Sequence, residues 1–365
     1  MTSPDNRRPR RRRRQNGESR SRETYAAIDL GTNNCRLLIA RPTAEGFRVV
    51  DAFSRIVRLG EGLSVNGRLS EAAMTRTIEA LKICARKMDR HRVTRARAVA
   101  TEACRRACNC RFFVERVERD VGVKLEIISN SEEASLGLYG CAPLLDPTVS
   151  HALIFDIGGG STEVSWLTVQ PIDGDRPGWR QPPPEIVDWL SVPLGVVSLT
   201  ERYGGIDIPE TAYDAMVEEV VEALAPFEGR NALSKRVENG QLQMLGTSGT
   251  VTTLSGIQKN LPRYDRARVD GSYLDFDSVA SLSRRIVGMP YDQRVGHPCI
   301  GAERADLVVA GCAILEAICR AWPVGRLRVA DRGLREGILF SLIRHDRHAA
   351  GRRRRDERAW NSAAG

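Results

Sequence analysis

The sequence predicts an α/β protein of two domains, each a mixed β-sheet flanked by helices. One glycine turn occurs twice, far apart in the chain, and short apolar runs alternate with helical patterns after each copy. A turn that is repeated in this way suggests two lobes that close on one phosphorylated substrate.

The two turns have the composition of phosphate sites. The first reads Ile-Asp-Leu-Gly-Thr-Asn-Asn over 28–34, and the second reads Phe-Asp-Ile-Gly-Gly-Gly-Ser-Thr-Glu over 155–163. Each follows one apolar run and precedes another, which predicts strand, tight turn, strand. Glycine permits positive φ and brings amides close to an anion, Thr or Ser adds a hydroxyl donor, and Asp can hold a hydrated metal ion. A single copy is also an ordinary β-turn, so the prediction depends on the pair.

The remaining elements follow from periodicity and from helix caps. In a first domain over residues 23–131 we expect strands over 46–56, 96–100 and 124–129, and helices over 70–90, from 101 and from 132. In a second domain over 132–333 we expect strands over 243–245 and 327–330, helices over 211–227, 277–289 and 304–319, and a surface loop over 171–184. The strand that ends at Gly-Thr-Ser-Gly-Thr, 246–250, predicts a third anion-binding turn. A last helix, about 334–345, is expected to return to the first domain.

Five further segments complete a family resemblance. They are Ala-Thr-Glu-Ala-Cys-Arg at 100–105, Ile-Ile-Ser-Asn-Ser-Glu-Glu-Ala at 127–134, Leu-Gly-Val-Val-Ser at 194–198, Gly-Thr-Ser-Gly-Thr at 246–250 and Gly-Leu-Arg-Glu-Gly at 333–337. With the two turns, in this order, the chain resembles the exopolyphosphatase and guanosine pentaphosphate phosphohydrolase family over about 25–343. The resemblance implies two actin-like, ribonuclease H-like domains, as in hsp70 and sugar kinases, in the short two-domain form, with the active site in the cleft between the domains.

The resemblance also implies a reaction and a set of site residues. The reaction is Mg²⁺-dependent hydrolysis of a terminal phosphoanhydride, with Glu133 as the catalytic base and Glu132 as a structural residue. The alternative for Glu133 is a helix N-terminal acid stabilised by the dipole. The candidates for holding Mg²⁺, directly or through water, are Asp29, Asp156 and Glu163. The candidates for phosphate contacts are Gly31, Thr32, Asn33, Arg105, Gly158, Gly159, Ser161, Gly249 and Thr250. Arg335 and Glu336 are expected to be a structural pair.

Three positions depart from the family pattern, and several functions stay open. Thr32 and Asn34 stand where the family usually has Ser, and Asn130 stands where it usually has Gly. The leading substrate is inorganic polyphosphate, and guanosine pentaphosphate is the alternative, because both present the same terminal anhydride. A sugar or acid kinase and an inactive polyanion-binding protein are the other possibilities. A homodimer is the family-like expectation.

The charge is concentrated at the two ends of the chain. Of the net +9, residues 1–22 carry +7, from nine Arg against Asp5 and Glu18, and residues 346–365 carry +3, so the remainder is near −1. Both ends are predicted to be disordered tails, which either solubilise the protein or attract a polyanion such as polyphosphate, RNA or DNA. No apolar run approaches the ~20 residues of a membrane span. A cytoplasmic protein is expected, with its nine cysteines as buried thiols, neither disulfides nor a zinc site.

Overall fold

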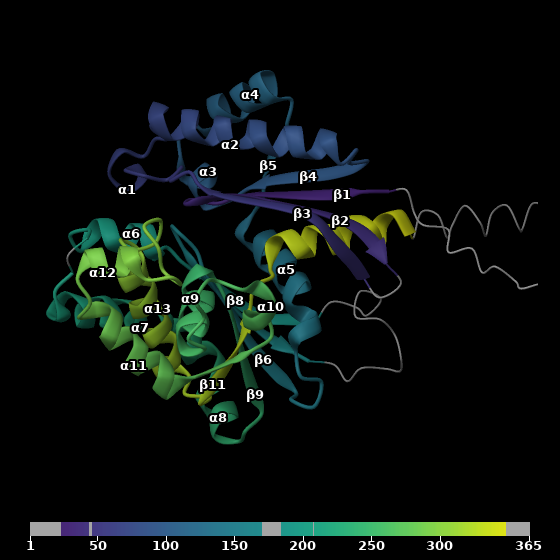
Figure 1. Ribbon diagram of the computed structural model, residues 1–365. Helices are drawn as coiled ribbons and strands as arrows, with labels where there is room; N and C mark the ends of the chain where they lie inside the picture. Colours follow the sequence, from purple (N-terminus) through teal and green to yellow (C-terminus); the bar gives the residue numbers. More distant parts are fainter. Residues whose placement is uncertain (1–22, 44–45, 170–183, 207, 348–365) are drawn as a thin grey trace, which may run out of the picture.

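The computed structural model describes residues 23–43, 46–169, 184–206 and 208–347, which form two mixed sheets flanked by helices (Figure 1). This arrangement confirms the predicted α/β fold of two domains. The loop predicted over 171–184 lies outside the described residues except for its last residue. The tails predicted over 1–22 and 346–365 lie outside them except for residues 346–347. The predicted domain boundaries stay a prediction.

The first sheet has the strand order β3-β2-β1-β4-β5. Its strands are β1 (Tyr25–Leu30), β2 (Asn34–Thr43), β3 (Gly46–Ile56), β4 (Arg95–Ala100) and β5 (Leu125–Ile127). β1 pairs antiparallel with β2 and parallel with β4, which places the first glycine turn between two central strands. This sheet carries the repeated motif at the carboxyl end of β1.

The second sheet repeats the same start, with the order β10-β11-β9-β6-β7-β8. Its strands are β6 (His151–Ile157), β7 (Thr162–Thr168), β8 (Glu185–Val192), β9 (Leu242–Thr247), β10 (Tyr273–Asp275) and β11 (Arg326–Ala330). β6 pairs antiparallel with β7 and parallel with β9. The second and third glycine-containing segments therefore lie side by side, at the carboxyl ends of the adjacent parallel strands β6 and β9.

Helices flank both sheets, most of them on the outer faces. They are α1 (Leu63–Asn66), α2 (Glu71–Arg90), α3 (Glu102–Arg106), α4 (Cys110–Val121), α5 (Asn130–Cys141), α6 (Val196–Arg202), α7 (Glu210–Asn231), α8 (Leu233–Glu238), α9 (Gly249–Gln258), α10 (Arg266–Val269), α11 (Phe276–Val287), α12 (Tyr291–Gly296) and α13 (Val308–Ala321), with a short 3-10 helix, Ala142–Leu144, after α5. A last helix spans 334–347. Ser70 caps α2 as predicted, because its side chain accepts a hydrogen bond from the Ala73 amide.

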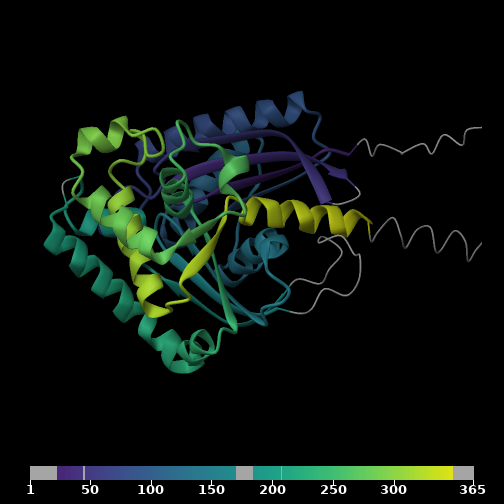
Figure 2. The same cartoon turned by 60° about the horizontal axis from the view of Figure 1, so that its bottom comes forward.

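Each sheet alternates its buried side chains between an outer and an inner core. In the first sheet, Ile28 packs outward with the α2 and α4 residues Leu81 and Phe113, whereas Ala27 packs inward with Ile338 of the last helix. In the second sheet, the outer core contains Phe155 and residues of α7, α9, α11 and α13, and the inner core contains residues of α5. Two helices, α5 and 334–347, therefore lie between the sheets, and the last helix runs along the first sheet (Figures 1 and 2).

These two inner helices cross at glycine. A Cβ atom at Gly140 of α5 would overlap the Gly333 carbonyl, and one at Gly337 would overlap the Leu136 carbonyl. The crossing therefore brings backbone against backbone, which only glycine permits at these positions.

One predicted helix begins at a different residue. The expected helix over 304–319 starts at Val308, because Arg304 lies in a preceding turn in which its amide donates to Gly301 and its carbonyl accepts from Leu307. The shift matters for function, because Arg304 lies in this turn and not on a helix, and it lines the cavity described below. Within the described ranges, no helix combines the length and the apolar character that crossing a membrane requires.

Candidate active site

The two repeated turns close in the same way. In the first, the Gly31 amide donates to the Asn34 carbonyl at 2.9 Å, and in the second the Gly158 amide donates to the Ser161 carbonyl at 2.9 Å. The equal hydrogen bond shows that the duplicated sequence folds into a duplicated hairpin. Both turns face the space between the sheets.

Two of the turn glycines, Gly158 and Gly159, are needed for space rather than for positive φ. Gly31, Gly158 and Gly159 all keep ordinary φ values, contrary to the reason that the sequence suggested. A Cβ atom on Gly159 would come within 3.1 Å of the Thr32 Cβ, which a well-packed contact does not allow. The two turns therefore touch each other through glycine, and this contact forms the floor of the cleft.

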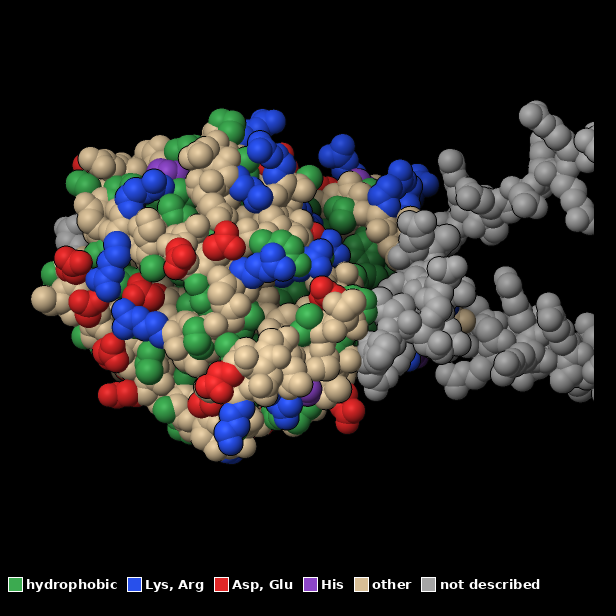
Figure 3. Space-filling view, turned by 90° about the horizontal axis from the view of Figure 1, so that it is seen from below, with side chains coloured by type: hydrophobic (Ala, Val, Ile, Leu, Met, Phe, Trp, Pro, Cys, Tyr) green, Lys and Arg blue, Asp and Glu red, His purple; other side chains and the backbone are tan. Residues whose placement is uncertain are grey.

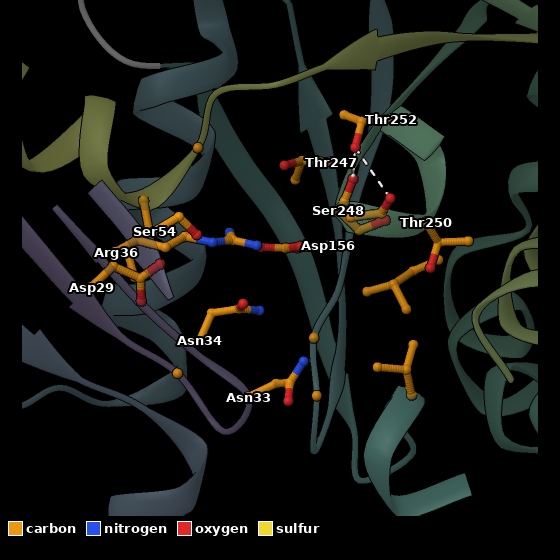
Figure 4. Close-up of a pocket in the computed structure, with 18 of the residues that line it drawn as sticks. Asp29, Asn33, Asn34, Arg36, Ser54, Asp156, Thr247, Ser248, Thr250 and Thr252 are labelled. Carbon is orange, nitrogen blue, oxygen red and sulfur yellow. Dashed lines mark hydrogen bonds between the residues drawn. The ribbon is translucent and has the colours of Figure 1, made fainter. Parts of the chain in front are cut away.

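A cavity of about 470 Å³ lies above this floor. All predicted site residues except Arg105 line it, namely Asp29, Gly31, Thr32, Asn33, Glu133, Asp156, Gly158, Gly159, Ser161, Glu163, Gly249 and Thr250. In Figure 4 the first-domain residues Asp29, Asn33 and Arg36 face Asp156 and Ser248 of the second domain. The sequence therefore identified residues that the fold brings to one place from both domains.

Carboxylates on both hairpins face the cavity, and they affect one another. Asp29 lies opposite Arg36 across β1 and β2, whereas Asp156 lies opposite Glu163 across β6 and β7. Desolvation raises the pKa of Asp29 above its ordinary range, and it raises the pKa of Asp156 to about 7. Desolvation and the nearby Asp156 raise the pKa of Glu163 to about 7, against hydrogen bonds from two serines. One cation among these groups would favour their ionised forms.

Glu133 lies on the first turn of α5, which Ser129 caps by accepting a hydrogen bond from the Glu132 amide. Burial, together with the charge of Glu163, raises the pKa of Glu133 to about 8, although Arg105 opposes this shift. A carboxylate with such a pKa accepts a proton more readily than an ordinary Glu does. Its position in the cavity therefore suits a general base.

In this structure Arg105 binds carboxylates beside the cavity, and its predicted phosphate contact stays a prediction. Its guanidinium donates to Glu133 at 2.7 Å, to Glu102 at 3.0 Å and to the Ile128 carbonyl at 3.0 Å. It does not line the cavity, whereas Glu102 does. Two carboxylates, those of Glu102 and Glu133, bind the same guanidinium. Arg105 therefore orients Glu133 in this structure.

The third turn lies between β9 and α9. Ser248 caps α9 by accepting a hydrogen bond from the Val251 amide at 3.1 Å. Thr252 donates its hydroxyl to the Ser248 carbonyl at 2.9 Å, as the dashed line in Figure 4 shows. Residues 247–250, at the carboxyl end of β9 and the start of α9, line the cavity, which is the position expected of an anion-binding turn.

Several cavity residues were missed by sequence reasoning. They are Arg36, Glu102, Tyr264, Arg266, Arg304, Asp331, Arg335 and Glu336. Arg36 had a usable signal, because it follows the first turn and alternation places it on the same face as Asp29. Glu336 accepts from Arg266 at 2.7 Å and from the Gly333 amide at 2.9 Å, and against desolvation the charges of Arg335 and Arg266 both lower its pKa. These residues come from five separate segments of the chain, and residue spacing along the sequence does not predict that they come together.

The donor set is compatible with Mg²⁺. Among the described residues, no three acidic, His or Cys side chains converge closely enough to hold a metal ion by themselves. Mg²⁺ usually keeps several waters and takes only one or two carboxylates, together with substrate phosphates. Asp29, Asp156 and Glu163 offer oxygen ligands to the cavity from hairpins of both domains. They fit a hydrated ion rather than a closed protein cage.

Known proteins resemble this chain along most of its length. Residues 38–346 match the model of the Ppx/GppA phosphatase family. Exopolyphosphatase 2 of Mycobacterium tuberculosis is 30% identical over 334 residues, which cover 87% of this chain and 98% of that protein. The crystal structure of the Aquifex aeolicus family member is 28% identical, covers 89% of this chain and 98% of its own, and has a TM-score of 0.69.

A second solved structure bears on the fold alone. An exopolyphosphatase from Cytophaga hutchinsonii is 24% identical, covers 88% of this chain and 98% of its own, and has a TM-score of 0.77. The predicted actin-like fold, with two mixed sheets flanked by helices, is confirmed by this likeness and by that of the Aquifex protein. The family match includes the acidic pair and the second and third turns. This chain therefore belongs to the Ppx/GppA phosphatase family.

Proposed function

We propose that this phosphatase is an Mg²⁺-dependent exopolyphosphatase, which releases the terminal phosphate from inorganic polyphosphate. The observation that carries the proposal is the place of Glu133, a half-buried carboxylate with a raised pKa, in the cavity where the three predicted anion-binding turns meet. The resemblance to the Mycobacterium tuberculosis exopolyphosphatase supports the choice of substrate.

The proposed reaction assigns one task to each group of residues. The three turns, with Thr32, Ser161 and Thr250 among their residues, bind the terminal phosphoryl oxygens, mainly through their backbone amides. Glu133 accepts a proton from water, the water oxygen bonds to the terminal phosphorus, and the anhydride bond to the shortened chain breaks. Arg105 keeps Glu133 oriented. Mg²⁺, held by Asp29, Asp156 and Glu163 directly or through water, supplies positive charge for the phosphoryl oxygens.

Guanosine pentaphosphate is a second candidate substrate, and one observation favours it. The aromatic ring of Tyr264 lines the cavity and is 38% exposed, so it offers a flat face on which a purine base can stack. Its hydroxyl donates to Asp331, which fixes the ring at the cavity wall. Polyphosphate has no base, so the two substrates should depend differently on this residue.

A single comparison tests the proposal. Phosphate release is measured on long-chain polyphosphate, guanosine pentaphosphate and ATP, each with and without Mg²⁺, for the wild-type protein and for Tyr264→Ala. Fastest release from polyphosphate, dependent on Mg²⁺ and insensitive to Tyr264→Ala, is the expected result. Release that is fastest from ATP would overturn the assignment, and release from none of the three would favour a polyanion-binding protein.

A further inference from the structure

A short segment of the first domain, residues 57–64, reaches the second domain at two places. We call it the bridging segment. At one of them, the Arg58 guanidinium forms an ion pair of 2.8 Å with Oδ2 of Asp306. The Asp306 side chain is only 12% exposed, and its Oδ1 has no hydrogen-bond partner among the described residues. Arg58 is therefore the cation that balances a nearly buried charge of the other domain.

At the second place, one carboxylate of α6 accepts from two donors of the bridging segment. Oε1 of Glu201 accepts from the Gly62 amide at 3.0 Å, and its Oε2 accepts from the Ser64 hydroxyl at 2.6 Å. These contacts hold α1 beside α6, where Figure 1 shows the two helices facing each other across the domain boundary.

The same segment holds the first phosphate turn. The amides of Val57 and Arg58 both donate to the Asn33 carbonyl, at 2.8 and 3.0 Å. The Gly60 amide donates to the Thr32 carbonyl at 2.9 Å. A movement of the bridging segment therefore moves the backbone of the first turn with it.

Its partners in the second domain are attached to the other two turns. The helix that carries Glu201 begins against the second turn, where the amides of Val196 and Val197 donate to the carbonyls of Gly158 and Gly159 at 3.0 and 2.8 Å. The turn that carries Asp306 also carries Arg304, which donates to Thr253 of α9 at 3.0 Å. The bridging segment thus connects all three phosphate turns through Arg58, Glu201 and Asp306, whose side chains do not line the cavity, although the last link, from Arg304 to α9, does line it.

The backbone of Arg58 is held in a costly conformation. Its φ is 48°, in the left-handed region that a residue with a Cβ atom enters at a cost of about 1 kcal/mol. This φ belongs to the geometry in which the Arg58 amide reaches Asn33 while its side chain reaches Asp306. Strain of this kind persists only where the surrounding contacts impose it, and it is often found at functional sites.

From these contacts we infer that the bridging segment is an interdomain clasp, and that Arg58 and Glu201 are positioning residues for phosphate hydrolysis. Closing the clasp sets the first turn against the second and third, so that donors from both domains meet the same phosphoryl group. The inference uses the proposed hydrolysis of polyphosphate only as a readout.

The test compares Arg58→Ala, Arg58→Lys, Glu201→Gln and Asp306→Asn in the full chain. We expect Arg58→Ala and Glu201→Gln to lower kcat about tenfold, with KM changed less than about twofold, because these residues align donors and do not bind substrate. Arg58→Lys should recover most of the loss, since it keeps the charge. The double variant Arg58→Ala with Asp306→Asn should lose no more than the worse single variant, as a coupled pair requires.

Arg111→Ala is the matched control, because Arg111 forms an exposed ion pair with Glu115 inside one helix. A kcat within about twofold of wild type for both Arg58→Ala and Glu201→Gln would overturn the clasp, as would additive losses in the double variant. Hydrogen exchange gives a readout without turnover: Glu201→Ala should speed exchange in 57–64 but not in α2. If wild-type protein does not hydrolyse polyphosphate, the proposed substrate fails, and the exchange measurement still decides the clasp.

Discussion

Glu133 differs from its neighbour Glu132 in the contacts that matter for proton transfer. Glu133 faces the cavity and binds Arg105, whereas the Glu132 side chain is 43% exposed and accepts from Arg97 at 2.6 Å. We expect Glu133→Gln to lower kcat by about 10²-fold or more while polyphosphate still binds, since a missing general base has that cost. Steady-state kinetics and substrate binding give the comparison, and Glu132→Gln serves as the control. A folded Glu133→Gln protein with near-normal turnover would exclude this residue as the base.

The raised pKa of Glu133 makes a prediction about pH. The base must be ionised to accept a proton, and its pKa is about 8, so kcat/KM should rise with pH through this region and fall as pH decreases below it. Arg105 lowers this pKa, and Arg105→Gln should therefore move the midpoint to higher pH. Ionisation of the substrate cannot produce that movement. Identical midpoints for wild type and Arg105→Gln would mean that another group controls the profile.

The cavity carboxylates also predict how Mg²⁺ affects stability. The folded-state pKa values of Asp156 and Glu163, about 7, lie above their unfolded values, so the folded protein binds more protons and loses stability as pH rises through this range. A bound cation should restore that stability. We expect Mg²⁺ to raise the Tm more at about pH 8 than at about pH 5, in thermal melts without substrate. The effect should shrink in Asp156→Asn and Glu163→Gln, and a pH-independent shift that both variants retain would place the ion elsewhere.

At the scale of elements, the crossing of α5 with the helix over 334–347 predicts a contrast between two glycines of one helix. Gly140 faces the backbone of Gly333, whereas a Cβ atom at Gly137 meets nothing within 4 Å. Gly140→Ala should lower the free energy of unfolding by at least 1–3 kcal/mol, the usual range for overpacking. Gly137→Ala should raise it by roughly 0.5–1 kcal/mol through helix propensity. Urea unfolding of both variants is the measurement, and equal effects would mean that the helices do not touch at Gly140.

Local sequence patterns predicted the helices, strands and turns well, but they did not predict which residues distant in sequence come into contact. The hairpins of both sheets, the cap at Ser70 and the turn before α9 follow from residues that are neighbours in sequence. Arg304 was assigned to a helix because apolar spacing continues through its turn, although the backbone there bonds as a turn. The role of Arg105 depended on how Glu102 and Glu133 approach it from two helices. Such competition between charges is fixed only by the tertiary fold.

For the whole molecule, the distribution of charge suggests a role for the arginine-rich ends. On the face drawn in Figure 3, Lys and Arg side chains are interspersed with Asp and Glu, whereas residues 1–22 alone carry nine Arg. Removing residues 1–22 should leave hydrolysis of short polyphosphate unchanged at saturation. For long chains, which can reach the cavity and the tail together, it should raise KM at low salt.

Kinetics of the truncated and full proteins over a range of salt concentrations decide this prediction. The difference in KM should close as salt rises, because screening weakens attachment to the tail. Equal KM values on long chains at low salt would limit the tail to solubility or point to a nucleic-acid partner. Short polyphosphate is the internal control, since it cannot span both places.

The contact of α5 with the last helix also limits how the two halves of the molecule can move. The chain passes from the first half to the second through α5 and returns just before residue 334, and these two passages touch at Gly140 and Gly337 without intervening side chains. Two rods in backbone contact resist sliding, yet they can tilt about the point where they meet. We therefore expect this point to act as a pivot, with the bridging segment at the far end of a lever arm. A small rotation about this crossing then displaces Arg58 by a larger distance. The few weak contacts of the bridging segment can therefore control how one domain rotates against the other.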